Sequence, residues 1–449
     1  MSSFRPLYGF EAGSLIGRHQ GRPVTAARFC TAAMELAACL PRKRYVLNLC
    51  EDRLNFMLGF VATLIAGQAN LLPPSRAAGA VREIFASYPE ACCLADHNEL
   101  PSGLPAMIVP PWTAGRADTF EVPCIAADQL ATIVFTSGST GRPQAHPKSW
   151  RSLVTGARTL ARRLEIAAGT NWTMLGTVPP QHMYGLETTI MLPLQSGMAV
   201  HPGRPLLPAD VRAALSEMPP TRWLATTPLH LRACLAEDMD VPELSGVLAS
   251  TMPMSEELAQ AVERRWHVPV HEIYGCTEAG TVALRRPART GQWRFCDGIH
   301  AWQSAEETWI AGGHLDNALR LPDCLSLLDG EQFMLHGRPG DMVKIGGKRA
   351  SLQALNSELL RIQGVRDGVF FLPEAAGTEA PLRLAALVVA PRLESEAILS
   401  ALRERIDPAF LPRPLLMVDA LPRNATGKLA REGLLALARE ALALERRRA

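Results

Sequence analysis

The stretch ATIVFTSGSTGRPQAHPKSW, residues 131–150, decides the fold prediction. Residues 131–136 are apolar enough for a buried strand, and small, hydroxyl-bearing and glycine residues follow up to Gly141. Such a segment offers backbone N–H groups and hydroxyls with few side chains in the way, and glycine allows a close approach. The sequence therefore predicts an anion-binding loop, most suited to phosphate, at the end of a buried strand.

Two alternatives compete with a phosphate loop at this place. A string of serine, glycine and threonine can be a polar surface loop and nothing more. The P-loop of nucleoside triphosphatases, G-x-x-x-x-G-K-[ST], does not fit, because Pro143 stands five residues after Gly138 and Gln144 follows it. The segment is thus a phosphate loop of another kind or an ordinary polar loop.

Strand-like apolar runs alternate with helical patterns over most of the chain. Amphipathic segments, such as residues 255–266, lie between several of these runs. Strands that alternate with helices favour βα units and largely parallel sheets, so the expected fold class is α/β. The apolar runs occupy residues 131–136, 172–178, 198–201, 223–226, 247–250 and 268–274.

The chain is expected to form two domains, because single cores stop growing at roughly 250–300 residues and this chain has 449. After Gly337 the expected elements become short and form a compact α+β unit. We expect a body with the flanked parallel sheets over residues 1–338 and a small, mobile domain over residues 339–449. The expected elements of the small domain are helices at 352–362 and 395–406, strands at 367–372, 382–390 and 415–418, and a closing helix from Leu429.

Composition and charge exclude several classes of protein. The chain has 46 basic and 44 acidic residues, and a formal charge of +2 is too small for a general field that captures nucleic acid. The longest apolar stretch, residues 56–67, is shorter than the roughly 20 residues of a membrane span, so a buried helix is expected there. Ten cysteines without a CxxC pair predict reduced thiols and a cytoplasmic location.

Five segments together carry a resemblance to a known family. Residues 136–143, TSGSTGRP, resemble the phosphate-binding signature of the AMP-forming adenylating superfamily, which includes acyl- and aryl-CoA synthetases, adenylation domains of nonribosomal peptide synthetases, and firefly luciferase. The other four are similar to the family's motifs and follow in the family's order: PQHMYGL at 180–186, YGCTE at 274–278, GRPGDMVKIGG at 337–347 and LPRNATGK at 421–428.

The resemblance implies a reaction in two steps. The carboxylate of a small acid attacks the α-phosphate of ATP, which gives acyl-AMP and pyrophosphate. A phosphopantetheine thiol, on an acyl carrier protein or on CoA, then takes the acyl group. Because negative charge gathers on the phosphates, Mg²⁺ and cationic side chains are expected at the site.

The resemblance also implies a nucleotide site built from several motifs. Glu278 would ligate Mg²⁺, Thr277 would hydrogen-bond the α-phosphate, and Tyr274 would pack on the adenine. Asp323 would accept the ribose hydroxyls, although Leu-Pro stands before it where the family has Thr-Gly. The whole nucleotide set is Thr136, Ser137, Gly138, Ser139, Thr140, Gly141, Ser250, Thr251, Met252, Tyr274, Gly275, Asp323, Arg338 and Lys344.

The resemblance implies that Lys428 catalyses the first step. Its ammonium, on a flexible side chain, can neutralise both the carboxylate and the α-phosphate. His182 and Thr277 complete the implied catalytic set. Lys428 belongs to the small domain, which must therefore close over the body. For the second step the family rotates this domain about a hinge, here Gly340, which withdraws Lys428 and brings up the segment that begins at Lys344.

The acid pocket is expected at His182, Met183, Tyr184 and Gly185, with His182 against the substrate carboxylate. Relatives that activate amino acids generally carry aspartate at the position of Met183, and a thioether cannot compensate a buried ammonium. An α-amino acid is therefore disfavoured. The region before Ala131 is short and His-Pro-Lys follows the phosphate loop, as in stand-alone hydroxybenzoate ligases of aryl-polyene and xanthomonadin-type pigment pathways.

A hydroxybenzoate is thus the expected acid, and a medium-chain or β-hydroxy fatty acid is the alternative. A non-catalytic nucleotide-binding regulator with this fold is the alternative from another class. The chain departs from the family at Gln144, where a lysine commonly closes the phosphate loop. Lys148 is a candidate for the missing positive charge if the loop turns back.

Overall fold

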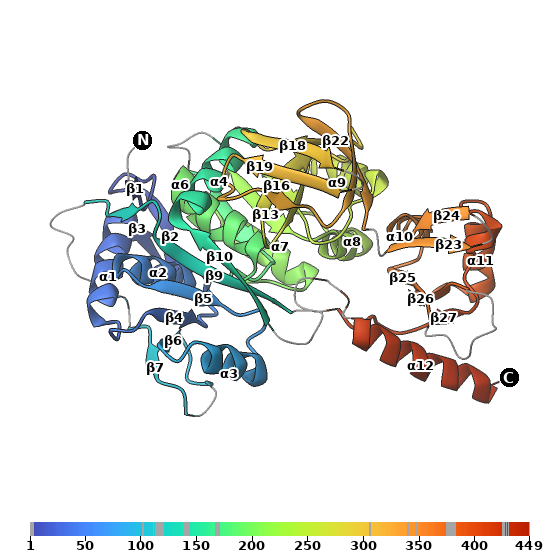
Figure 1. Cartoon of the computed structure of the whole chain (residues 1–449), viewed down its shortest axis with the longest axis horizontal. Helices are drawn as coiled ribbons and strands as arrows, with labels where there is room; N and C mark the ends of the chain where they lie inside the picture. Colours follow the sequence, from blue (N-terminus) through green and yellow to red (C-terminus); the bar gives the residue numbers. More distant parts are fainter. Residues whose placement is uncertain are drawn as a thin grey trace.

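Two sheets carry the part of the chain before residue 338 (Figure 1). The computed structural model describes residues 4–100, 103–110, 112, 121–137, 143–166, 171–304, 307–338, 341–345, 348–373, 383–423, 427, 429 and 431–448. The smaller sheet is parallel except for its edge pair, the hairpin of β9 and β10. Its order is β10 (Pro143–Ser149), β9 (Leu130–Ser137), β5 (Ala69–Leu72), β4 (Tyr45–Asn48), β6 (Ala91–Ala95) and β7 (Ala106–Ile108).

The larger sheet has a parallel centre and antiparallel ends. Its direction reverses at the turn between β15 and β16, and again between β2 and β3. The fold class predicted from the sequence, α/β with largely parallel sheets, is confirmed. The order is β21 (Cys324–Leu327), β22 (Gln332–Gly337), β17 (Trp293–Phe295), β16 (Gly280–Arg285), β15 (Val270–Cys276), β14 (Leu244–Ala249), β13 (Arg222–Thr226), β11 (Thr173–Gly176), β12 (Ala199–Val200), β2 (Leu15–His19) and β3 (Arg22–Thr25).

The helices begin at polar caps where the sequence provides them. Asp52 accepts the N–H groups of Leu54 and Asn55, and Ser255 accepts that of Leu258, so each cap satisfies N–H groups that the first turn leaves unpaired. The helices of this part are α1 (Ala26–Cys39), α2 (Arg53–Ile65), α3 (Ala78–Ser87), α4 (Trp150–Arg163), α5 (Met183–Leu186), the π-helical turn η1 (Glu187–Met191), α6 (Leu192–Ser196), α7 (Pro208–Glu217), α8 (Pro228–Ala236) and α9 (Glu256–Trp266).

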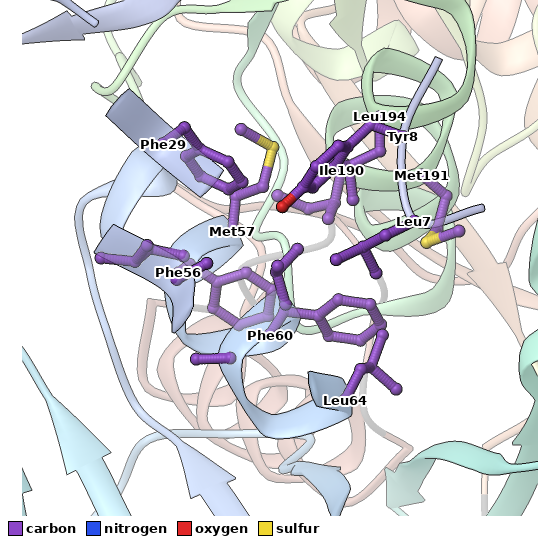
Figure 2. Packing of buried hydrophobic residues seen from close by; sticks show 14 of the residues in the cluster. Leu7, Tyr8, Phe29, Phe56, Met57, Phe60, Leu64, Ile190, Met191 and Leu194 are labelled. Atoms are coloured by element: carbon purple, nitrogen blue, oxygen red, sulfur yellow. The ribbon is translucent and has the colours of Figure 1, made fainter. Parts of the chain in front are cut away.

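A core around α2 joins the N-terminal elements to the segment that follows the expected acid pocket. Figure 2 shows Phe56 and Phe60 of α2 in one cluster with Phe29 of α1 and with Ile190 and Leu194. All five side chains are buried. Because closely packed interiors resist shifts of even one methylene, this contact fixes the pocket segment relative to the smaller sheet.

The elements after β22 lie together at one end of the molecule, beyond α8 (Figure 1). Their buried side chains form clusters with one another, from Val343 to Leu415 and from Val369 to Ala438. The elements are β23 (Met342–Ile345), β24 (Lys348–Ser351), α10 (Leu352–Leu360), β25 (Asp367–Phe371), β26 (Ala385–Val389), α11 (Ser395–Arg403), the 3₁₀ turn η3 (Pro408–Phe410), β27 (Leu415–Met417) and α12 (Arg431–Arg448).

Two small sheets complete the part of the chain before residue 338. One is the pair β1 (Phe4–Pro6) and β8 (Cys124–Ala126), and the other is β18 (Ile299–Ser304), β19 (Glu307–Gly312) and β20 (Leu319–Arg320). Among the helices in the described ranges, none has the length and apolar character needed to cross a membrane.

Candidate active site

Two of the predicted nucleotide segments emerge at the same edge of the larger sheet. Ser250 and Thr251 follow β14, and Tyr274 lies in the last part of β15, which pairs in parallel with β14. Ser250 Oγ donates to the carbonyl oxygen of Ile273 at 2.9 Å, which ties the two segments together. Ligands of open parallel sheets bind beyond the carboxyl ends of the strands, and this edge is such a place.

Tyr274, Asp323 and Arg338 form a connected group. The Tyr274 hydroxyl donates to Asp323 Oδ2 at 2.8 Å, and Arg338 Nε lies 3.5 Å from Asp323 Oδ1. Burial raises the pKa of Tyr274, and the neighbouring Asp323 carboxylate raises it further. The Tyr274 ring packs against Trp293 and Phe333, at centroid distances of 5.6 and 5.7 Å, so its position is fixed from behind.

Thr251 is strained and has an unpaired hydroxyl. Its φ of +78° is a region that β-branched residues rarely adopt, and such strain gathers at ligand sites. Its Oγ1 is buried without a hydrogen-bond partner among the described residues. A buried hydroxyl without a partner is costly, so this oxygen is suited to a ligand polar group.

The turn after Tyr274 presents two further predicted residues. A Cβ on Gly275 would lie 2.1 Å from the carbonyl oxygen of Gly280, so only glycine permits this close hairpin. Thr277 is half-buried and Glu278 is exposed. An exposed carboxylate on a tightly closed turn is suited to ligate a cation.

The hairpin β9–β10 carries what the structure describes of the phosphate loop. Thr136 Oγ1 lies 3.1 Å from His146 Nε2, and Gln144 is exposed opposite Thr136 in the ladder. Ser137 ends β9, while Gly138, Ser139, Thr140 and Gly141 lie outside the described residues. Lys148 does not turn back toward the loop but is buried, with its ammonium bonded to the carbonyl oxygen of Glu278.

The predicted acid pocket begins at His182, which precedes α5 and is partly exposed. Met183 is buried, and its Cε lies 3.2 Å from where a Cβ on Gly280 would stand. Gly185 is needed at its place, since a Cβ there would lie 2.0 Å from the carbonyl oxygen of Pro179. The pocket segment therefore packs against the same turn that carries Glu278.

Tyr184 differs from its expected use in one respect. Its hydroxyl donates toward the carbonyl oxygens of Thr226 and Leu248, at 3.1 and 2.9 Å, and burial raises its pKa. These bonds tie the ends of β13 and β14 together. The hydroxyl is thus engaged by the backbone, and only the ring remains to line a pocket.

The C-terminal lysine motif reaches this site. A Cβ on Gly427 would lie 3.3 Å from the Sδ atom of Met252, next to Thr251. Arg423 donates to Gly427 O at 2.7 Å and forms two bonds with Asp367, at 2.6 and 2.7 Å. Lys428 lies outside the described residues, as does Gly340, and Lys344 is exposed on β23.

Three buried titratable residues contact the turn that carries Glu278, and the sequence did not predict these contacts. They are Lys148, Glu187 and His314, and burial lowers the pKa of Lys148 and His314 and raises that of Glu187. Glu187 and His314 lie outside every motif, and Lys148 entered only as a possible loop charge. For Lys148 the alternation along β10, where buried His146 and Lys148 flank exposed Pro147, is a local pattern that indicates burial.

Comparisons with known proteins identify the family of this chain. The family described as AMP-binding enzyme matches residues 31–297. A 4-coumarate–CoA ligase of Halorhodospira halophila is 28% identical over 321 residues, 70% of this chain and 78% of that protein. A 3-hydroxybenzoate–CoA/4-hydroxybenzoate–CoA ligase of Thauera aromatica is 25% identical over 362 residues, 70% of this chain and 68% of that protein.

A solved structure shows that the likeness extends over the whole fold. The O-succinylbenzoate coenzyme A synthetase of Bacillus subtilis, in complex with ATP and a magnesium ion, superposes with a TM-score of 0.79 at 19% identity. The match covers 96% of this chain and 99% of that one. The family match spans more than half of the chain and includes three of the five motifs, so the chain belongs to the AMP-binding enzyme family and is an AMP-forming ligase.

Proposed function

We propose that this ligase activates a hydroxybenzoate-type aryl acid with ATP and transfers the acyl group to a phosphopantetheine thiol. The observation that carries the proposal is the group of Tyr274, Asp323, Arg338 and Thr251 beside the pocket segment. Asp323 offers acceptors for a vicinal diol, and Thr251 offers an unpaired hydroxyl. Nucleotide and acid would therefore lie on neighbouring segments at one sheet edge.

Magnesium fits the residues present. Mg²⁺ usually keeps several waters and takes one or two carboxylates together with substrate phosphates. Glu278 is an exposed carboxylate of this kind, and the described residues contain no cluster of three or more candidate ligands that would suggest an all-protein cage. Bound there with ATP, the ion would neutralise charge on the phosphate oxygens.

In the first step, a carboxylate oxygen of the acid forms a bond to the α-phosphorus of ATP while the bond from that phosphorus to the bridging oxygen breaks. Pyrophosphate leaves, and Thr277 would donate to an α-phosphate oxygen. His182 would orient the carboxylate. Lys428 would place its ammonium between the two anions, where charge neutralisation is worth most because water is excluded.

We also propose that residues 339–449 act as a lid domain on a body formed by residues 1–338. The support is that the buried clusters from Val343 onward contain side chains of this segment alone. Gly427, the residue before Lys428, already lies against Met252. Rotation about Gly340 would then exchange Lys428 for the Lys344 segment, and the thiol would attack the acyl carbon with AMP as the leaving group.

The acid class follows from the pocket side chains. Met183 is buried and apolar, so it provides no counter-charge for the ammonium of an α-amino acid. The Tyr184 ring and Met252 would present flat and adaptable apolar surface to an aromatic ring. Relatives named for 4-coumarate and for hydroxybenzoate support the choice of an aryl acid.

The thiol acceptor is proposed to be an acyl carrier protein or CoA, and the relatives named as CoA ligases support a phosphopantetheine thiol. We place the enzyme in the cytoplasm. All ten cysteines are free, and reduced thiols are typical of that compartment.

The proposed function is tested by ATP–pyrophosphate exchange with a panel of acids. We expect exchange with hydroxybenzoates and none with α-amino acids, because Met183 leaves an ammonium unpaired. Exchange with medium-chain or β-hydroxy fatty acids alone would replace the aryl assignment. Silence with every acid, while ATP still raises the melting temperature, would show a non-catalytic nucleotide-binding protein instead.

Gln144→Lys is expected to lower the KM for ATP. Gln144 is exposed opposite Thr136, where an added ammonium would face the phosphates. The variant Gln144→Met, similar in length but neutral, serves as the control and should leave this KM unchanged. An unchanged or higher KM in Gln144→Lys would contradict the account, and steady-state kinetics with saturating acid measure it.

Asp323→Ala should weaken ATP binding, because the variant loses the acceptor proposed for the ribose hydroxyls. We expect the KM for ATP to rise about tenfold or more, because hydrogen bonds to a charged group contribute about 1.5–3 kcal/mol. The KM for 2′,3′-dideoxy-ATP should change little, since that nucleotide lacks the hydroxyls that Asp323 would bind. Equal losses for both nucleotides would place Asp323 away from the ribose.

A further inference from the structure

The turn from Cys276 to Thr281 is held on its buried side by side chains from three separate parts of the chain. Lys148 on β10 donates from its ammonium to the carbonyl oxygen of Glu278. This bond joins residues 130 positions apart and connects the smaller sheet to the larger one. It therefore fastens the backbone of Glu278 to the hairpin that leads to the phosphate loop.

Glu187, the first residue of the π-helical turn, holds the far end of the turn. Its Oε1 accepts the Thr281 N–H at 3.0 Å and its Oε2 accepts the Thr281 hydroxyl at 2.8 Å. Glu187 is 6% exposed, and a buried carboxylate needs such donors. Burial raises the pKa of Glu187, and the Thr281 donors and the Lys148 ammonium partly oppose this effect.

His314 supplies the third attachment. Its Nε2 donates to the carbonyl oxygen of Ala279 at 2.8 Å, and the side chain is 3% exposed. Consecutive carbonyl oxygens, of Glu278 and Ala279, and the N–H of Thr281 are thus all satisfied by buried side chains. A backbone fixed in this way loses little freedom when its exposed carboxylate binds a ligand.

We propose that Lys148, Glu187 and His314 are positioning residues that fix Glu278 for the magnesium–nucleotide complex. The inference rests on the proposed role of Glu278 as the magnesium ligand. None of the three needs to touch the metal or the substrate. Their function is to hold the turn so that the Glu278 carboxylate is presented without an ordering cost.

Lys148 therefore has a different role from that of the lysine that commonly closes the phosphate loop. Its ammonium is bonded to a backbone carbonyl oxygen and its side chain is buried, so it is not free to follow a phosphate. The missing charge at Gln144 is therefore not replaced at the phosphates by Lys148. Lys148 acts on magnesium binding through Glu278. Substitution of Lys148 is therefore expected to change the Mg²⁺ dependence, whereas Gln144→Lys is expected to change the KM for ATP.

The test measures the Mg²⁺ concentration for half-maximal effect in Lys148→Met. Two readouts are used: the Mg²⁺-dependent rise in melting temperature with ATP and no acid, and ATP–pyrophosphate exchange. We expect this concentration to rise about tenfold or more in both, since a hydrogen bond from a charged donor is lost. The KM for the acid should stay within about twofold of the wild-type value.

Matched variants control for a general loss of structure. Lys43→Met makes the same chemical change at an exposed lysine and should leave both readouts at their wild-type values. Lys148→Arg keeps a charged donor and should recover part of the Mg²⁺ response. If Lys148→Met fails to fold, Thr281→Val takes its place, because this variant removes only the hydroxyl bond to Glu187. It is also expected to raise the Mg²⁺ concentration for half-maximal effect.

A folded Lys148→Met with a wild-type Mg²⁺ dependence would overturn the inference, and so would an equal loss of acid affinity. If Lys148→Met does not fold, a wild-type Mg²⁺ response in Thr281→Val overturns it. Failure of the proposed function looks different. In that case the wild-type enzyme itself would show no pyrophosphate exchange with any acid.

Discussion

The site depends on one backbone constraint: the larger sheet reverses direction at a turn that lies against buried structure. A hairpin turn that packs on buried side chains has polar backbone groups on its inner side that water cannot reach, and each one must find a partner in the protein. Here Lys148 donates to the carbonyl oxygen of Glu278, and His314 donates to that of Ala279. Glu187 accepts the N–H of Thr281. The bonds that satisfy these buried backbone groups also fix the position of the exposed Glu278 carboxylate.

This constraint connects the parts of the molecule that take part in chemistry. The hairpin β9–β10 brings the phosphate-loop strand to the turn, and the pocket segment reaches it through Met183 and Glu187. Tyr274, just before the turn, holds Asp323 from the other side. The proposed nucleotide, metal and acid sites are therefore arranged around one short segment, which suits a reaction between two anions that must be positioned closely.

The sequence predicts well where a pattern is local. The strand expected at 131–136 is β9, Leu130–Ser137, and the helix expected at 255–266 is α9, because apolar periodicity and a serine cap suffice to define them. The resemblance located the segments that meet at Tyr274 and Thr251. It did not reveal Glu187, His314 or the bonds of the Tyr184 hydroxyl, because these depend on residues far apart in the chain and on a π-helical turn that no local pattern marks.

We propose that the lid domain supplies a cation, Lys428, which offsets charge at the α-phosphate during adenylation. The most direct measurement compares two single-turnover rates in Lys428→Ala: formation of acyl-adenylate from acid and ATP, and thioester formation from supplied acyl-adenylate. The account predicts that the first rate falls about a hundredfold or more while the second stays near the wild-type rate. Acyl-adenylate formation at the wild-type rate would contradict it.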